Sequence, residues 1–175
     1  MTTTEDMMIR SLLQDAFARI EDQVAAAVDG LTVEDAGWRP DEDANPVGWL
    51  LWHLTRVMDD HVAALAAVDQ AWTAQGFADD FALPFPVETV GYGQTSAEVG
   101  QFRAEPAALL AYHRATQELV RSHLAGVTAT GLERIVDENW DPPVTEAVRL
   151  MSVLGDATSH MGQAEYVLGL LERRD

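Results

Sequence analysis

The sequence contains no cysteine and no lysine. Without cysteine the chain can form no disulfide and carries no thiol nucleophile, so any sulfur chemistry requires a thiol that arrives with a cofactor or substrate. Eleven basic residues, all arginine, stand against 29 acidic residues, which gives a formal net charge of −18. Such an excess of negative charge repels phosphate backbones and anionic membrane surfaces. We therefore expect neither a nucleic-acid partner nor a membrane partner.

Long apolar runs and a signal sequence are also lacking. No stretch approaches the roughly eighteen consecutive apolar residues of a membrane-spanning helix, and residues 1–6 lack the basic start and apolar centre of a signal peptide. The composition, 47% hydrophobic and 23% charged over 175 residues, is typical of one soluble domain that spans residues 1–175. We expect a cytoplasmic protein. The sequence shows no glycine-rich phosphate loop and no G-x-S-x-G serine, which disfavours nucleotide binding and serine-hydrolase chemistry.

Apolar residues recur at steps of three and four in four segments, which predicts four long helices. Their expected ranges are Thr4 to about Asp29, Pro46 to about Asp69 or beyond, Pro106 to about Leu124, and Thr145 to the polar tail at residues 172–175. Asn45 is a preferred N-cap ahead of Pro46, and Thr145 is a suitable cap for the last helix. Four helices in this order predict an all-α four-helix bundle, a fold that builds metal sites from inward side chains of facing helices.

A long apolar connection between the second and third helices, residues 72–105, departs from this pattern. Glycines and prolines interrupt it, yet it keeps six aromatic residues: Trp72, Phe77, Phe81, Phe85, Tyr92 and Phe102. Loops longer than about 12–15 residues are usually functional lids or disordered linkers, and aromatic content argues against disorder. Two interpretations follow: a lid that walls a substrate pocket at one end of the bundle, or an aromatic plug that only caps the core.

One pair of residues on the last helix indicates a metal site. Asp156 and His160 are four residues apart, so they share a helix face at about 5–6 Å between Cβ atoms and can reach one ion. A third ligand has to come from another helix, and His53 is the best candidate because the apolar residues around it mark that side of its helix as inward-facing. Two imidazoles and one carboxylate leave coordination positions open, as in catalytic zinc and facial-triad iron sites. Each residue alone is also compatible with a hydrogen-bonded core histidine or a solvated aspartate.

Three motifs stand out along the chain: a W-R-P turn within residues 31–40, an N-P-x-G-W-L-x-x-H helix start at residues 45–53, and H-x-G-Q at residues 160–163. Together they resemble the DinB/YfiT-like superfamily, which includes mycothiol-dependent maleylpyruvate isomerases and related thiol transferases. The resemblance implies a metal bound by a histidine of the second helix and by two residues four apart on the last helix. These positions correspond to His53, Asp156 and His160. Asp156 departs from the family pattern, because members commonly carry histidine or the longer glutamate there.

The resemblance implies a metal-dependent enzyme, either a thiol S-transferase or a thiol-assisted isomerase, that acts on a small-molecule substrate or a low-molecular-weight thiol. Zinc fits this ligand set best, and nickel, iron and manganese stay open. The resemblance makes mycothiol a candidate cosubstrate. The composition points the same way, because arginine in place of lysine together with much alanine indicates a GC-rich, actinobacterial genome, and mycothiol is the common small thiol of actinobacteria. The resemblance also suggests a homodimer. The alternative is a non-enzymatic helical bundle that binds a small ligand or a partner and retains a degenerate metal site.

Three further residues are candidates near the expected site. Asp60 follows His53 by two helical turns on nearly the same face, where it would act as a general base or a hydrogen-bond acceptor, or simply be solvated. Arg56 is a candidate for binding an anionic part of a cofactor or substrate, or it offsets nearby acids. Gln163, inside the H-x-G-Q motif, is a candidate for hydrogen-bonding a bound ligand or a neighbouring helix.

Overall fold

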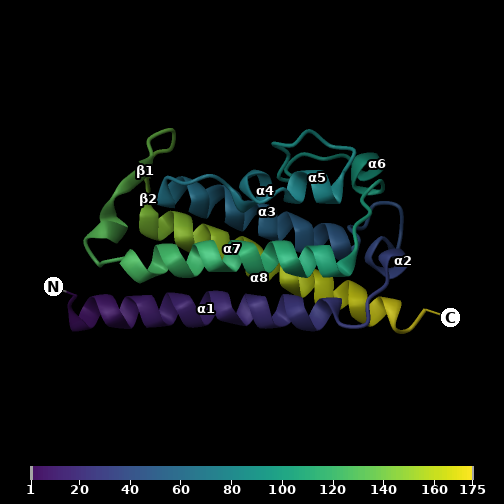
Figure 1. Cartoon of the computed structure of the whole chain (residues 1–175), viewed down its shortest axis with the longest axis horizontal. Helices are drawn as coiled ribbons and strands as arrows, with labels where there is room; N and C mark the ends of the chain where they lie inside the picture. The colour runs from purple at the N-terminus through teal and green to yellow at the C-terminus, as the bar shows by residue number, and fades with distance from the viewer. Residues whose placement is uncertain (1, 175) are drawn as a thin grey trace.

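The computed structural model describes residues 2–174, and within this range it is an all-α bundle (Figure 1). Its four long helices are α1 (Thr4–Val28), α3 (Val47–Ala66), α7 (Pro106–Gly126) and α8 (Glu146–Leu171). Helix α3 packs against α7 and α8, and α1 packs against the same two helices. The predicted four-helix bundle is confirmed. None of the helices in residues 2–174 is long and apolar enough to span a membrane.

Short elements occupy the connections between the long helices. They are α2 (Val33–Ala36), α4 (Ala71–Ala74), α5 (Phe77–Phe81), α6 (Ser96–Val99), a 3-10 turn η1 (Gly131–Glu133), and the strands β1 (Ile135–Asp137) and β2 (Val144–Thr145). The two strands pair antiparallel immediately ahead of α8. The sequence pattern did not predict this hairpin, because strands of two and three residues are too short to show an alternating apolar pattern.

The boundaries of α3 differ from the expected ones at both ends. Pro46 takes the N-cap position in an extended conformation, so the helix begins one residue later than predicted and without a side-chain cap from Asn45. The helix ends at Ala66 rather than near Asp69. Its C-cap, Ala67, adopts the left-handed conformation with φ 54° and ψ 46°, which terminates a helix. The predicted cap of α8 is confirmed, since the Thr145 side chain accepts a hydrogen bond from the helix backbone.

Small side chains on α8 set how closely it approaches α3. Ala157 and Ala164 are both fully buried, and a helix with alanine on its buried face allows its neighbour to come near. Gly155 and Gly162 of α8 are exposed. Helix α8 packs more extensively against α3 than against any other helix.

The connection between α3 and α7 packs onto the bundle instead of extending into solvent (Figure 1). Trp72, Phe81 and Phe102 are buried in the core. The ring of Trp72 lies 5.1 Å from that of Tyr112 on α7, measured between centroids. These aromatic side chains form a plug, as one of the two interpretations of the sequence predicted. A different part of the same connection contacts the candidate metal centre described below.

A buried polar network anchors this connection to α3. The Asp59 carboxylate accepts hydrogen bonds from the backbone N–H groups of Ala71 (2.9 Å) and Trp72 (2.8 Å) and from the hydroxyl of Tyr112 (2.8 Å). The guanidinium of Arg56, which is also buried, lies 3.8 Å from the same carboxylate and donates to Tyr112 (3.2 Å). A buried ion pair is retained without a large penalty only when its polar atoms find partners. Asp59 and Arg56 satisfy this condition together.

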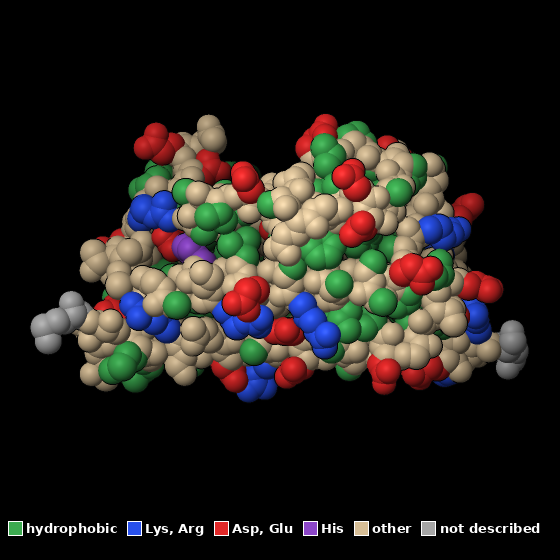
Figure 2. Space-filling view, viewed as in Figure 1, with side chains coloured by type: hydrophobic (Ala, Val, Ile, Leu, Met, Phe, Trp, Pro, Cys, Tyr) green, Lys and Arg blue, Asp and Glu red, His purple; other side chains and the backbone are tan. Residues whose placement is uncertain are grey.

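The surface carries the negative charge in a dispersed form. On the face shown in Figure 2, acidic side chains are scattered along the whole length, and arginines occur between them without gathering into one broad basic patch. Proteins that bind nucleic acid usually present such a patch. The absence of a nucleic-acid partner stays a prediction.

We expect Asp59→Ala to destabilise the fold by about 3–5 kcal/mol, because the change leaves the buried Arg56 charge without its partner and the start of α4 without its acceptor. Chemical denaturation measures the free energy of unfolding. The control is Asp15→Ala, which removes an exposed ion pair with Arg19, and we expect no measurable loss from it. Equal stability of the two variants would contradict a structural role for the network.

A second buried group, His113, is held as the neutral imidazole. The Thr55 hydroxyl donates to the Leu51 carbonyl (2.8 Å), so its oxygen accepts from Nδ1 of His113 (2.9 Å). The Gln117 amide donates to Nε2 of the same ring (3.1 Å). Burial lowers the pKa of His113 to about 3. A proton on Nε2 of His113 would point at the Gln117 N–H group, and two donors repel each other. The hydrogen-bond network therefore destabilises the charged imidazolium form of His113.

This arrangement predicts that the fold loses stability as the pH falls below about 6.5. In that range the unfolded chain binds a proton at His113 that the native protein does not bind, which costs up to about 1.4 kcal/mol per pH unit down to the native pKa. Nuclear magnetic resonance of the imidazole checks the cause. The His113 ring signals should not titrate between pH 7.5 and 4.5, and a midpoint above pH 5 would contradict the prediction.

Candidate metal centre

His53 of α3 and Asp156 and His160 of α8 meet at the contact between these two helices. One potential donor atom from each residue lies within 4.8 Å of the other two. The imidazole centroids of His53 and His160 are 4.6 Å apart, and the ring planes are nearly perpendicular at 80°. We refer to these three residues as the metal cluster. They offer two imidazole nitrogens and one carboxylate within reach of a single ion.

Hydrogen bonds outside the metal cluster orient both imidazoles. Nδ1 of His53 donates to the Val90 carbonyl, and Nδ1 of His160 donates to the side-chain carbonyl of Gln163 (3.0 Å). A carbonyl oxygen only accepts, so each Nδ1 carries the proton and each neutral ring keeps its lone pair on Nε2. Histidines that bind metals are commonly oriented in this way by an acceptor on the opposite ring nitrogen.

The Asp156 carboxylate has one oxygen with an unmet interaction. Its Oδ2 atom is buried and has no hydrogen-bond partner among the described residues, while Oδ1 lies 3.5 Å from Nε2 of His160. Buried polar atoms almost always have a partner, and one without it indicates a missing ion or water. A divalent cation would supply the interaction that Oδ2 lacks. The residues present therefore fit a bound metal.

The metal cluster is closed on the α3 side and open on the α8 side. His53 is 2% exposed, whereas the side chains of Asp156 and His160 are 20% and 18% exposed. Burial lowers the pKa of His53, and the neighbouring carboxylate of Asp156 raises the pKa of His160. His53 is thus neutral at neutral pH, which is the form of histidine that binds a metal. A ligand would approach the cluster from the side of α8.

Residues 89–94, which we call the strap, run over His53 and are tied to α3. Three hydrogen bonds tie the strap to α3: Trp49 donates to Gln94 (2.7 Å), His53 donates to the Val90 carbonyl, and Arg56 donates to the Thr89 carbonyl (3.2 Å). Gly91 within the strap has φ +107°, and a Cβ atom there would lie 2.4 Å from Nδ1 of His53. Only glycine allows the strap to pass this close to the imidazole.

Tyr92 of the strap lies at the opening of the metal cluster. Its ring is 5.1 Å from that of His53 and perpendicular to it, and the residue is 62% exposed. Partial burial, followed by the negative charge of Asp156, raises the pKa of Tyr92. The strap therefore contacts the cluster, as the lid interpretation requires, while other aromatic residues of the same connection form the plug. Closure of the strap over a ligand stays a prediction.

The three further candidates lie at different distances from the metal cluster. Gln163 contacts it directly through His160. Arg56 is buried, and its guanidinium contacts several protein groups, including the Gln70 side chain (2.9 Å). Asp60 accepts a hydrogen bond from the same Gln70 (2.7 Å) and is partly exposed. These contacts give Arg56 and Asp60 structural partners, and their expected roles in cofactor binding and in catalysis stay predictions.

Sequence reasoning missed the residues that support His53. The indole of Trp49 stacks on the His53 ring at 4.7 Å between centroids and 14° between planes. The strap supplies the Val90 carbonyl, the close approach at Gly91 and the Tyr92 side chain. The run Gly91-Tyr-Gly93 indicates a turn, and both glycines have positive φ, but this run alone does not indicate that the turn contacts His53. Trp49 also falls one helical turn before His53.

Comparisons with known proteins agree with this architecture. A sequence profile of the DinB superfamily matches residues 16–163, a range that includes all three residues of the metal cluster. A solved structure from Enterococcus faecalis, described as a conserved protein, shares 32% sequence identity with this chain. The alignment covers 99% of each chain with a TM-score of 0.87. A search of curated proteins finds no match.

Gly91→Ala tests the support of His53, and Gly93→Ala is its matched control. Both changes place a methyl group at a positive φ, where an L side chain is strained, but only the methyl at position 91 meets His53, since nothing lies within 4 Å of one at position 93. We expect Gly91→Ala to weaken Co²⁺ binding at least about tenfold, measured by absorbance titration. Gly93→Ala should change it by less than about twofold. Equal affinities in folded samples of both variants would contradict the role of the strap.

Proposed function

The chain belongs to the DinB superfamily, and from this membership and the convergence of His53, Asp156 and His160 we propose that it is a metal-dependent enzyme that acts on a small thiol or its conjugates. The observation that carries the proposal is the unpartnered Oδ2 of Asp156 beside two imidazoles whose Nδ1 atoms are both hydrogen-bonded to carbonyl oxygens, which leaves Nε2 of each ring as the possible metal ligand. A structural polar cluster would instead satisfy its own atoms.

The chain's own residues divide the work at this centre. His53, Asp156 and His160 would hold a divalent ion, and two imidazoles with one carboxylate leave coordination positions for a substrate. When bound, such an ion acts as a Lewis acid and lowers the pKa of a coordinated thiol or water. Trp49 and the strap cover His53 and keep water from that side. Zinc suits the donor set best.

The proposal includes a small thiol as cosubstrate. The chain has no cysteine, so a sulfur nucleophile must come from a small molecule, and mycothiol is the candidate that the resemblance to thiol transferases favours. In the transfer reaction the thiol would lose its proton and its sulfur would form a bond to an electrophilic carbon while the leaving group departs with its bonding electrons. The alternative is a thiol-assisted isomerisation, in which the thiol adds to the substrate and is released again. We propose further that the protein is a homodimer and acts in the cytoplasm.

A second candidate, a non-enzymatic bundle with a degenerate site, is favoured by one observation. The carboxylate of Asp156 already lies 3.5 Å from Nε2 of His160, and this contact raises the pKa of the imidazole. The two side chains could form an ion pair in place of binding a metal. Under this candidate the protein would bind a small ligand or a partner without turnover.

Metal analysis and thermal melts of protein purified without a histidine tag separate the two candidates. We expect about one divalent ion per chain, a lower melting midpoint after chelation, and recovery with Zn²⁺. A metal at about 100 times its Kd stabilises the fold by about 2.7 kcal/mol. Asp156→Ala and His160→Ala should lose this response and also the metal-dependent transfer of mycothiol to an electrophilic dye.

The control for histidine removal is His123→Gln, since His123 pairs with Glu146 at the end of α7 (2.9 Å) and lies outside the metal cluster. This variant should still bind about one divalent ion per chain, and chelation should still lower its melting midpoint. If chelation leaves the melting midpoint unchanged, and if added Zn²⁺, Ni²⁺, Fe²⁺ or Mn²⁺ does not raise it, the non-enzymatic bundle is supported instead.

A further inference from the structure

Three buried polar side-chain atoms have no hydrogen-bond partner among the described residues: Oδ2 of Asp156, Oγ1 of Thr116 and Nε1 of Trp52. The first belongs to the metal cluster. The third belongs to a separate cavity of about 100 Å³, which Trp52 lines and to which no residue of the metal cluster contributes. We call it the Trp52 cavity. An indole N–H can only donate, and buried donors almost always have an acceptor. Nε1 of Trp52 therefore indicates that an acceptor is missing.

The Trp52 cavity lies between α3 and the connection that leads to α7. Its buried residues are Trp52 of α3 and Trp72 of α4, which are 1% and 3% exposed. The other lining residues come from α5 and the loop after it: Ala78, Asp79, Leu83, Phe85, Pro86 and Val87. The Trp52 ring lies 6.3 Å from that of Trp72 and 6.0 Å from that of Phe85, measured between centroids. Aromatic and aliphatic side chains thus form most of the wall.

Hydrogen bonds hold this wall in place before any ligand binds. The Trp72 indole donates to the Val87 carbonyl (2.8 Å), and the Trp72 backbone N–H donates to the buried carboxylate of Asp59 (2.8 Å). These two contacts fix α4 to α3 and the loop to α4. They also engage the indole N–H of Trp72. Of the two tryptophans that line the cavity, Trp52 is therefore the one that can donate to a ligand.

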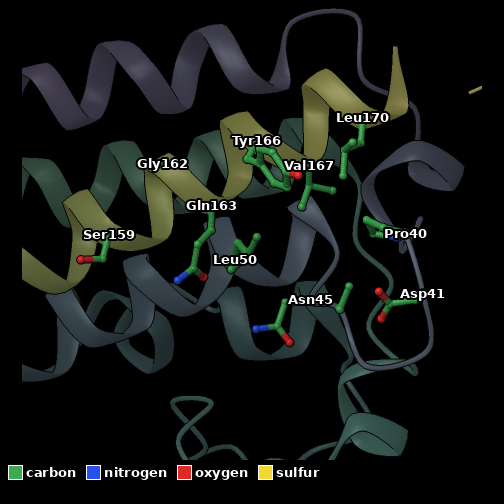
Figure 3. A pocket seen from close by; sticks show the side chains of 11 residues that line it. Pro40, Asp41, Asn45, Leu50, Ser159, Gly162, Gln163, Tyr166, Val167 and Leu170 are labelled. Carbon is green, nitrogen blue, oxygen red and sulfur yellow. The ribbon is translucent and has the colours of Figure 1, made fainter. Parts of the chain in front are cut away.

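A larger groove of about 600 Å³ lies elsewhere, between the second half of α8 and the start of α3 (Figure 3). Among the described residues, it shares no lining residue with the Trp52 cavity, and none of the three unpartnered atoms belongs to a residue that lines it. Its size is therefore its only indication of a ligand. The Trp52 cavity combines an enclosed space with a donor that lacks its acceptor.

The size and polarity of the Trp52 cavity limit what can occupy it. A dry cavity of about 150 Å³ holds benzene, so this one fits roughly four or five non-hydrogen atoms. Ordered water needs about two to four polar partners, whereas an organic molecule with one acceptor oxygen needs only the N–H of Trp52. Among the described residues that line the cavity, Asp79 is the only charged one. An anion would therefore lose its hydration without gaining an ion pair.

We propose that the Trp52 cavity binds a small uncharged carbonyl compound. The carbonyl oxygen accepts from Nε1 of Trp52, and the alkyl groups pack against Trp72 and Phe85. A carbonyl oxygen is an acceptor only, which matches an indole that is a donor only. The site is separate from the metal cluster, and it does not depend on the proposed function.

The indole signal of Trp52 tests this contact directly. The chain has five tryptophans, and the signal of residue 52 is the one that Trp52→Phe removes from a proton–nitrogen correlation spectrum. The probe is butan-2-one, and its control is 2-methylbut-1-ene, in which a CH₂ group replaces the oxygen. We expect butan-2-one to move the Nε1–H proton signal downfield in a saturable way and the alkene not to do so. A signal that butan-2-one leaves in place, as it would with water as the only occupant, overturns the inference.

Trp52→Phe separates the hydrogen bond from the apolar fit, because it keeps an aromatic ring and removes the N–H. Ligand-observed nuclear magnetic resonance measures the affinity for both probes. The variant should weaken binding of butan-2-one at least about fivefold and change binding of 2-methylbut-1-ene by less than about twofold, since only the ketone loses a hydrogen bond. An equal change for the two probes would overturn the proposed contact.

Ala78→Leu and its control Ala74→Leu test the location. Both alanines lie in short helices of the same connection, but Ala74 is exposed and does not line the Trp52 cavity, whereas Ala78 does. Leucine at position 78 fills part of the cavity and should weaken both probes at least about fivefold, and leucine at position 74 should change them by less than about twofold. Both variants keep Trp52, so this test holds even where Trp52→Phe does not fold. Unchanged binding of butan-2-one to folded Ala78→Leu would overturn the inference.

Discussion

The close contact between α3 and α8 is the constraint on which the candidate site depends. His53 reaches Asp156 and His160 across the contact between α3 and α8, and the small buried side chains of Ala157 and Ala164 on α8 favour close packing of this helix against its neighbours. Larger side chains at these two positions would separate the helices and leave three isolated polar residues. The packing of the core therefore determines the geometry of the site.

The surrounding contacts prepare the site in advance of any ligand. The strap fixes the tautomer of His53, and Gln163 fixes that of His160, so each neutral ring carries its lone pair on Nε2. The strap is itself positioned by the buried network, since Arg56 donates to Thr89 and pairs with Asp59. Preorganisation of this kind has an energetic cost, which is visible in the unpartnered Oδ2 of Asp156 and the positive φ of Gly91.

The features that were predictable from the sequence are those that repeat within one helix. Apolar steps of three and four predicted α1, α3, α7 and α8, and the four-residue spacing of Asp156 and His160 predicted one side of the metal cluster. The strap was not predictable, because its contacts join a loop to a helix more than thirty residues away in sequence, between Val90 and His53, and such contacts leave no periodic pattern. For the same reason Arg56 suggested a ligand-binding cation, although it lies in the core beside Asp59. The hairpin of β1 and β2 was too short to detect.

Anomalous X-ray diffraction from crystals grown with Zn²⁺ tests the central claim most directly. The geometry predicts one strong peak at the zinc edge between α3 and α8, at about 2.0–2.2 Å from Nε2 of His53, from Nε2 of His160 and from a carboxylate oxygen of Asp156. If no such peak lies near His53, Asp156 and His160, and the Asp156 carboxylate is hydrogen-bonded to His160 or to water alone, the claim that these three residues form a metal centre is contradicted.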